Sequence, residues 1–308
     1  MTAPRRANAT RATADGRAYL DLRSEAKKAG RATAEYLRLY ALEGFLTRLA
    51  VSPHARHLVL KGGVLLAAYD LRRPTADIDF AALAQSREID HVRQLVVEVA
   101  RTVLPPGQDD GLQFDTSDAH AESIRDEDEY NGVRVTLRAR LATANETFHV
   151  DVNVGDPIWP QPETVHVPRL LGGQIDLLGY PIPMVLAEKV VTAAQRGTAS
   201  TRWRDFGDIY LLTGSHSFDA RAARGALLTV AAHRGADLRP LRGTLDGYAE
   251  LAQTRYRRWR DRQHLQDRLP DQFGELLEAT VRFADPLLDP TTVPDTATWA
   301  PATRDWSP

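Results

Sequence analysis

Gly62 and Gly63 are the first residues in the chain whose type and position suggest phosphate chemistry. They follow an apolar run at residues 57–60 that is predicted as a short strand, and a helix is expected over residues 64–70. Backbone N–H groups at a helix start attract anions, and glycine lets a phosphate approach the backbone closely. We therefore expect Gly62 and Gly63, with the preceding Lys61, to bind the phosphates of a nucleotide.

A pair of aspartates, Asp77 and Asp79, follows within a predicted strand at residues 77–83. Alternate strand residues share one face, so the two carboxylates lie about 7 Å apart along the chain. Aspartate is depleted in strands, and two carboxylates on one face can hold Mg²⁺, which bridges nucleotide phosphates. The pair therefore predicts a metal site, in preference to a solvated strand edge.

A third carboxylate, Asp151, lies on the polar face of an alternating strand predicted over residues 148–154. It is a candidate third metal ligand, or a base that takes a proton from an attacking hydroxyl. His149 and Asn153 share its face, so an ordinary polar-face residue is the alternative interpretation, and the sequence leaves this open.

These motifs, taken in order, resemble the AbiEii/AbiGii toxin family within the DNA polymerase β-like nucleotidyltransferase superfamily. The resemblance covers roughly residues 57–213 and rests on four motifs: Lys61-Gly62-Gly63, Arg73-Pro74-Thr75-Ala76-Asp77-Ile78-Asp79, Glu188-Lys189, and Arg204-Asp205-Phe206-Gly207-Asp208. It implies Mg²⁺-dependent transfer of a nucleotide from an NTP, with two metal ions possible. It also implies a growth-inhibiting toxin that has a cognate antitoxin and acts on RNA, with the tRNA 3′ end as the expected acceptor.

The resemblance also implies roles for individual residues. Asp77, Asp79 and Asp151 would hold the metal, Arg73 and Thr75 would join the glycines in binding nucleotide, and Lys189 and Asp205 would be catalytic. Lys189 would neutralise phosphate charge, and Asp205 would orient Lys189 or the acceptor hydroxyl. The alternatives are a solvated lysine beside Glu188 and an ion pair between Asp205 and Arg202.

Position 64 departs from the family pattern. Val64 stands where the family commonly has Ser or Thr, so a hydroxyl that would contact a phosphate is missing. Its loss would cost about 1–3 kcal/mol if nothing replaces it. We expect weaker binding of the NTP and an unaffected metal site.

Two arginine-rich stretches are candidate RNA surfaces. One is the polar face of a strand predicted over residues 133–141, with Arg134, Arg138 and Arg140. The other consists of helical residues Arg257, Arg258, Trp259 and Arg260. Arginines neutralise phosphates and an aromatic ring can stack on a base, but a solvated helix face with one core aromatic is the alternative.

The predicted architecture is α+β, with a mixed sheet flanked by helices and then a helical C-terminal domain. The boundaries we expect are a disordered tail at 1–20, the nucleotidyltransferase domain at 21–165, the helical domain at 166–290 and an irregular tail at 291–308. Residues 126–129 are expected to form a solvated turn, and 156–183 to be rich in loops.

The composition limits the remaining possibilities. The chain has 308 residues, no cysteine and a net charge of −2, so thiolate metal sites and a wholly basic nucleic-acid-binding surface are excluded. No signal-like or membrane-spanning apolar segment is evident, so we expect a cytoplasmic protein without a membrane partner.

Two other functions share these residues. One is a nucleotidyltransferase that acts on a small molecule or a protein, for which the arginine patches would be dispensable. The other is a non-catalytic regulator that binds NTP or RNA, which the substitution at Val64 favours and the intact Asp77 and Asp79 oppose.

Overall fold

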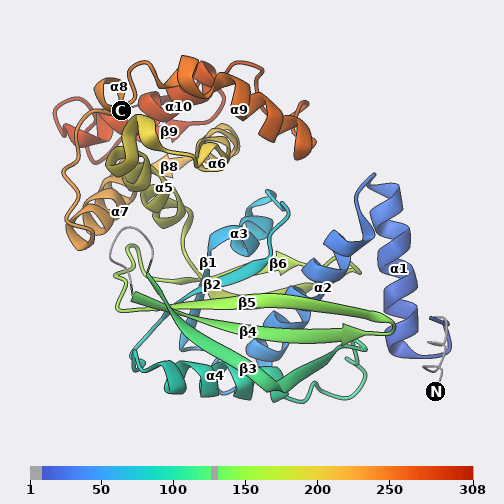
Figure 1. The fold of residues 1–308 in the computed structure, drawn as a ribbon. Coiled ribbons are helices and arrows are strands. Elements are labelled where there is room, and N and C mark those ends of the chain that lie inside the picture. Colours follow the sequence, from blue (N-terminus) through green and yellow to red (C-terminus); the bar gives the residue numbers. More distant parts are fainter. Residues whose placement is uncertain (1–8, 126–130, 308) are drawn as a thin grey trace. The chain divides into compact units, whose positions relative to one another are not determined.

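The computed structural model describes residues 9–125 and 131–307, and Figure 1 shows the fold. The chain divides into two compact units, each described here by itself. Unit 1 comprises Met1–Asp156 and Glu163–Gly179, and unit 2 comprises Pro157–Pro162 and Tyr180–Pro308. The first eight residues of the predicted tail and the predicted turn at 126–129 lie outside the described residues.

Unit 1 contains a seven-stranded mixed sheet with helices. Its helices are α1 (Ala14–Lys28), α2 (Thr33–Val51), the four-residue α3 (Gly62–Leu65), the 3₁₀ helix η1 (Leu66–Tyr69) and α4 (Ile89–Arg101). Its strands are β1 (Leu58–Lys61), β2 (Asp77–Ala82), β3 (Gln113–Arg125), β4 (Asn131–Leu141), β5 (Ala144–Val154), β6 (Glu163–Pro168) and β7 (Gln174–Gly179).

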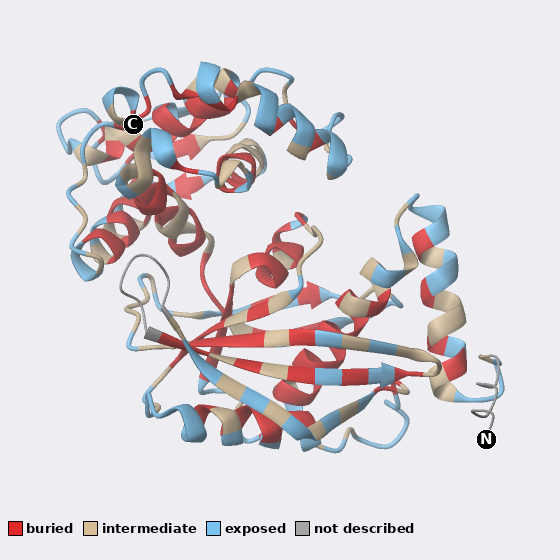
Figure 2. Ribbon diagram, viewed as in Figure 1, coloured by how far each residue is buried: buried red, intermediate tan, exposed pale blue. Residues whose placement is uncertain are grey.

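The strands lie in the order β3-β4-β5-β2-β1-β7-β6. The central strand β2 runs antiparallel to β1 and parallel to β5, and β4 runs antiparallel to both β3 and β5. Buried and more exposed residues alternate along β4 and β5 (Figure 2), which is the pattern of strands with one face in the core.

Helix α2 supplies the centre of the unit 1 core. Its Phe45 is fully buried and packs against Phe80 of β2 and Phe148 of β5, with ring centroids 6.5 and 6.1 Å apart. Phe114 of β3 completes the cluster at 6.4 Å from Phe45. These contacts hold β2 and β5 side by side, so the residues that alternate with Phe80 and Phe148 project from the other face of the sheet.

Unit 2 is mostly helical. Its helices are α5 (Ile182–Arg196), η2 (Gly197–Ala199), α6 (Trp203–Ser215), α7 (Ala220–His233), α8 (Leu241–Thr244), α9 (Tyr248–Arg262), α10 (Phe273–Ala284) and η3 (Asp285–Leu288). A small sheet joins β8 (Phe218–Asp219), β9 (Thr298–Ala300) and β10 (Asp305–Ser307). Rings of Phe206, Tyr248 and Phe273 pack together between α6, α9 and α10, with centroids 5.2–5.9 Å apart.

The α+β architecture is confirmed, but three predicted boundaries differ from the structure. Helix α1 begins at Ala14, within the segment predicted to be a tail. The segment Glu163–Gly179 belongs to the sheet of unit 1, although residues 166–179 were predicted to be in the helical domain. Strands β9 and β10 order the segment predicted to be an irregular C-terminal tail.

Long-range contacts explain two of these differences. Glu43 of α2 is buried and accepts hydrogen bonds from the Leu170 amide at 3.0 and 3.1 Å, which fastens the turn between β6 and β7 to unit 1. Trp299 of β9 is fully buried and donates to the Thr213 carbonyl at 2.7 Å. Such pairings join residues far apart in the sequence, so local patterns do not reveal them.

Candidate functional site

Asp77 and Asp79 lie on one face of β2. Both are partly exposed, whereas the alternating Ile78 and Phe80 are fully buried. Asp79 is the register partner of Lys61 on β1 and of Asp151 on β5, so the glycine motif and the third carboxylate flank it on adjacent strands. The predicted same-face arrangement of the Asp77 and Asp79 carboxylates is therefore present in the structure.

Gly62 provides the space that the Asp79 carboxylate occupies. Its φ is +65°, in the left-handed region that favours glycine. A Cβ at this position would lie 1.8 Å from Oδ2 of Asp79, so no side chain fits while Asp79 holds its place. The glycine thus serves the carboxylate as well as the backbone turn.

The helix predicted over residues 64–70 is present as two short pieces, and only the first is α-helical. The α-helical part contains only four residues, Gly62–Leu65, and continues as the 3₁₀ helix η1. So short a helix carries little macrodipole, and the helix-dipole part of the sequence argument does not apply here. Val64 is buried in this turn, so its side chain packs inside where the family commonly has a hydroxyl.

Thr75 lies where the glycine turn and the aspartate strand meet. Its hydroxyl donates to Oδ1 of Asp77 at 2.6 Å. A Cβ on Gly63 would lie 3.0 Å from the Thr75 hydroxyl oxygen and 3.5 Å from an Arg73 guanidinium nitrogen. The structure therefore brings the predicted nucleotide-binding residues Gly63, Arg73 and Thr75 together.

Lys61 is buried at the end of β1. Its Nζ donates to Oδ2 of Asp156 at 2.9 Å, and both side chains are 11% exposed. Asp156 follows β5 and was not singled out from the sequence. This ion pair orders the residue that leads into the glycine turn.

Asp151 is held by an arginine. Arg134 of β4, its register partner, donates from Nε to Oδ1 at 2.8 Å and from Nη2 to Oδ2 at 2.6 Å. The two hydrogen bonds to Asp151, with further contributions from Asp77 and Asp79, raise the pKa of Arg134 above its usual range. Arg134 therefore faces the carboxylate cluster, and its role here differs from the predicted RNA contact.

A metal ion fits the pair Asp77 and Asp79 better than the predicted set of three carboxylates. Among the residues that the structure describes, no group of three or more His, Cys, Asp or Glu side chains is arranged to hold a metal ion. The predicted role of Asp151 as a third ligand is not confirmed, since each of its oxygens accepts a hydrogen bond from Arg134. Mg²⁺ commonly takes one or two protein carboxylates and completes its shell with phosphate oxygens and water.

Lys189 of α5 lies in a buried polar cluster of unit 2. Its Nζ donates to Oδ1 of Asp205 at 3.0 Å and to Oδ2 of Asp208 at 2.7 Å, both on α6. Arg202 donates from Nε to the other oxygen of Asp205 at 2.6 Å. Asp205 thus makes both of the predicted contacts, one with Lys189 and one with Arg202.

The cluster holds Asp205 in its charged form. Burial alone would raise the pKa of Asp205, but the positive charges and hydrogen bonds of Lys189 and Arg202 hold it well below its usual range. Lys189 is 13% exposed and Asp205 is 4% exposed, so the pair is shielded from water. Asp208 is the last residue of the fourth sequence motif, Arg204-Asp205-Phe206-Gly207-Asp208.

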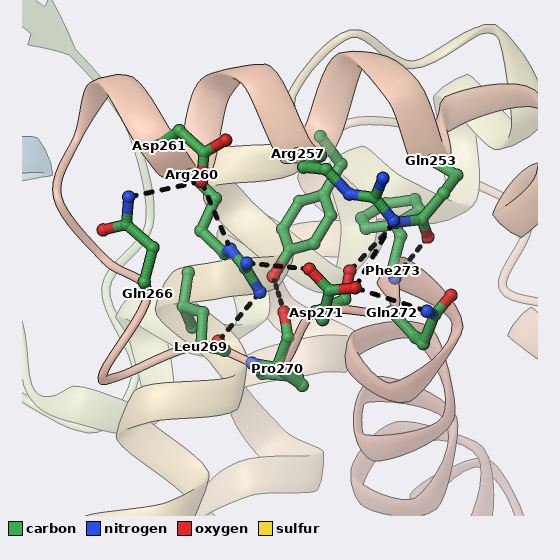
Figure 3. Close-up of polar contacts among 11 residues, drawn as sticks. Gln253, Arg257, Arg260, Asp261, Gln266, Leu269, Pro270, Asp271, Gln272 and Phe273 are labelled. Atoms are coloured by element: carbon green, nitrogen blue, oxygen red, sulfur yellow. Dashed lines mark hydrogen bonds and ion pairs between the residues drawn. The ribbon is translucent and has the colours of Figure 1, made fainter.

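The predicted RNA-binding stretch of α9 divides into two kinds of residue. Arg257 and Arg258 are exposed, and Arg257 pairs with Asp271 at 3.3 Å. Arg260 is 9% exposed, donates to Asp271 at 2.8 Å and to the Leu269 carbonyl at 3.4 Å, and so braces the segment after α9 (Figure 3).

Trp259 of the same stretch packs inward. A Cβ on Gly207 of α6 would lie 3.2 Å from its six-membered ring, and its ring centroid is 6.1 Å from that of Tyr256. Both Arg260 and Trp259 thus contribute to the packing of unit 2, and the predicted phosphate contact at Arg260 and stacking ring at Trp259 are not confirmed.

Sequence comparison decides the family. The family described as "Nucleotidyl transferase AbiEii toxin, Type IV TA system" matches residues 44–287, which is most of the chain. The chain belongs to the AbiEii family. It is a nucleotidyltransferase of a toxin–antitoxin system, and membership implies an antitoxin partner.

Two solved structures resemble this AbiEii protein at low identity. One is a candidate nucleotidyltransferase from H. pylori, 14% identical with a TM-score of 0.45, covering 80% of this chain and 94% of that one. The other is JHP933 from Helicobacter pylori, 13% identical with a TM-score of 0.32, covering 73% and 93%. Both similarities are too low to add anything to the family match. No curated protein matches the chain.

Arg134 and Asp156 lie outside the four motifs that carry the family resemblance. The alternation of the predicted strand at 133–141 placed Arg134 on the polar face, but the register that sets it opposite Asp151 appears only in the sheet. Among the described residues, no helix is long and apolar enough to span a membrane.

Proposed function

We propose that this AbiEii nucleotidyltransferase transfers a nucleoside monophosphate from an Mg²⁺-bound NTP to an RNA 3′-hydroxyl, with tRNA as the acceptor, and thereby inhibits growth. The observation that carries the proposal is the pair Asp77 and Asp79 on one face of β2, with the Asp79 carboxylate seated against Gly62. This arrangement combines the metal-holding and phosphate-approaching groups that the reaction requires.

Asp77 and Asp79 would hold Mg²⁺, which when bound would supply charge neutralisation for the transferring phosphate. The Thr75 hydroxyl fixes Asp77 through its 2.6 Å hydrogen bond and so orients one of the two carboxylates. Gly62 gives room to the Asp79 carboxylate, Gly63 lies beside Thr75 and Arg73, and Arg73 and Lys61 bring positive charge to the same turn.

In unit 2 we assign Lys189 to neutralising phosphate charge on the nucleotide. Asp205 and Asp208 fix its ammonium group, and Arg202 fixes Asp205 in turn. Two carboxylates hold the ammonium group of this buried lysine in one position, and a fixed position is what transition-state stabilisation needs. The assignment rests on the family motif together with this network.

For the acceptor, the exposed Arg257 and Arg258 of α9, with Arg138 and Arg140 of β4, are the remaining candidates for RNA phosphate contacts. Arg138 is 61% exposed and pairs only at the surface with Asp118. Surface ion pairs of this kind are weak and exchange readily for a phosphate. These residues support an RNA acceptor over a small molecule, which needs no basic surface.

The test is incorporation of label into total tRNA from each of the NTPs, in the presence of Mg²⁺, with Asp79→Ala as the control. Label that enters tRNA from one NTP and is absent with the variant supports the proposal and identifies nucleotide and acceptor. Mg²⁺-dependent NTP binding without incorporation would direct attention to a small-molecule or protein acceptor. Absence of both would favour the non-catalytic alternative.

A further inference from the structure

Four charged residues form one row across the sheet of unit 1. Lys61, Asp79, Asp151 and Arg134 are successive register partners on β1, β2, β5 and β4. Register partners on neighbouring strands project from the same face. Along the row the charges are cation, carboxylate, carboxylate, cation. Each outer cation forms an ion pair with a carboxylate: Lys61 with Asp156 and Arg134 with Asp151.

The two carboxylates of the row differ in their surroundings. Asp151 is buried, with a side chain 7% exposed, and each of its oxygens accepts a hydrogen bond from Arg134. Asp79 is partly exposed and lies against the backbone of Gly62. A two-point bond between guanidinium and carboxylate is among the strongest and most rigid polar contacts in proteins.

The ion pair between Arg134 and Asp151 affects which carboxylates can bind a metal ion. Neighbouring carboxylates repel one another, and a divalent cation is attracted to every carboxylate within reach. With Arg134 in place, the charge of Asp151 is neutralised and each of its oxygens already accepts a hydrogen bond. Without Arg134, Asp151 would be a buried, uncompensated charge next to Asp79, and a divalent cation would relieve it.

We propose that Arg134 is a positioning residue that withholds Asp151 from the metal, so that Asp77 and Asp79 alone are its protein ligands. The inference rests on the proposed function, because it presupposes a divalent cation at Asp77 and Asp79. It predicts that the affinity for a divalent cation rises when Arg134 is removed.

The direction in which cation affinity changes distinguishes this role from that of a residue that supports a metal ligand. Residues that brace metal ligands typically lower metal affinity by about 10–100-fold when they are removed. If Arg134 braced Asp151 as a ligand, Arg134→Met would weaken cation binding in that way. If Arg134 withholds Asp151, the same substitution tightens binding, and the tightening disappears when Asp151 is also replaced.

The experiment uses the full chain without nucleotide and Mn²⁺ as the probe, with free Mn²⁺ counted by electron paramagnetic resonance. The variants are Asp79→Asn, Asp151→Asn, Arg134→Met and the double variant Arg134→Met/Asp151→Asn. We expect weaker binding by about tenfold or more for Asp79→Asn, tighter binding for Arg134→Met, and affinity within about twofold of wild type for the other two.

The outcomes distinguish the two levels of the account. Unchanged Mn²⁺ affinity in Asp79→Asn would overturn the metal site itself, and with it the proposed function. Weakened binding in Asp79→Asn together with weakened or unchanged binding in Arg134→Met would overturn only the role of Arg134.

Thermal unfolding identifies any variant that does not fold. Arg134→Met leaves Asp151 unpaired, whereas the double variant removes both charges and is expected to fold. If Arg134→Met does not fold, the Mn²⁺ affinities of Asp151→Asn and of the double variant test the inference. Wild-type Mn²⁺ affinity in both supports the inference, and a loss in Asp151→Asn equal to that in Asp79→Asn contradicts it.

Discussion

The carboxylate of Asp79 lies against the backbone of Gly62, where a Cβ would come within 1.8 Å of Oδ2. Two separate motifs, the glycine pair and the aspartate strand, are therefore a single steric unit. The register of β1 against β2 sets this relationship by pairing Lys61 with Asp79. A side chain at position 62 would therefore displace the Asp79 carboxylate.

Gly62→Ala is expected to impair the site more than Gly63→Ala. The alanine at 62 adds backbone strain of about 1–2 kcal/mol at a φ of +65° and displaces Asp79. At position 63, which lies outside the left-handed region, the new Cβ meets the Thr75 hydroxyl oxygen at 3.0 Å and needs only a small shift. Mn²⁺ affinity and urea unfolding measure both effects, and equal Mn²⁺ affinities in the two variants would contradict this relationship.

Thr75→Val is expected to lower activity by about tenfold, because it removes the hydroxyl that donates to Asp77 at 2.6 Å. Thr75→Ser keeps the donor and should restore most of the rate. The measurement is kcat/KM for nucleotide transfer in the three proteins. Equal activity of the valine and serine variants would show that the hydrogen bond to Asp77 has no part in the reaction.

Asp205→Asn is expected to destabilise the protein by about 3–5 kcal/mol at pH 7, because it leaves Lys189 and Arg202 with one charged partner fewer in a buried cluster. Its exposed counterpart Asp237→Asn, paired with Arg239 at the surface, should change the free energy of unfolding by less than about 1 kcal/mol. Urea unfolding at pH 7 compares the two, and similar small effects would contradict the account of the cluster.

The stabilisation by Asp205 also has a defined pH dependence. Because the pKa of Asp205 is lowered in the folded protein, its contribution is fully present above the ordinary value of 3.8. It is lost as the pH falls below that value toward the lower folded pKa. The difference in unfolding free energy between wild type and Asp205→Asn should therefore shrink in acid, and a difference that grows in acid would contradict the lowered pKa.

The arginines of α9 are expected to separate into RNA-binding and structural residues. Replacing Arg257 and Arg258 by alanine should reduce the salt slope of tRNA binding by about 1 for each arginine that contacts a phosphate. Arg260→Ala should leave the slope unchanged and lower the melting temperature, because Arg260 is buried against Asp271 and the Leu269 carbonyl. A reduced slope in Arg260→Ala alone would reverse these assignments.

The sequence predicted the local parts of the site well. Strand alternation placed Asp77 and Asp79 on one face, and the structure has them there. The α+β architecture and the family followed from the order of the motifs, and the family match confirms the nucleotidyltransferase. The strand alternation depends on neighbouring residues, and the family on the order of short motifs along the chain, so neither needs the three-dimensional contacts.

What the sequence did not predict depends on register and long-range packing. The bond between Arg134 and Asp151 requires the alignment of β4 with β5, which the polar faces of the two strands do not specify. Likewise, the arginine-rich sequence around Trp259 and Arg260 indicated an exposed helix face. In the structure Trp259 packs near Gly207 of α6, and Arg260 pairs with Asp271 in the segment after α9. Solvation and burial of such side chains are decided only when the elements pack.

The central claim is that Asp77 and Asp79 support metal-dependent nucleotidyl transfer to RNA. The most direct measurement is the initial rate of pyrophosphate release from the active NTP, with and without tRNA and Mg²⁺. The proteins compared are wild type, Asp77→Asn, Asp79→Asn and the exposed control Asp176→Asn.

We predict release that requires both tRNA and Mg²⁺, is retained by Asp176→Asn, and falls by about two orders of magnitude or more in the other two variants. Release at the wild-type rate by Asp77→Asn and Asp79→Asn would contradict the claim.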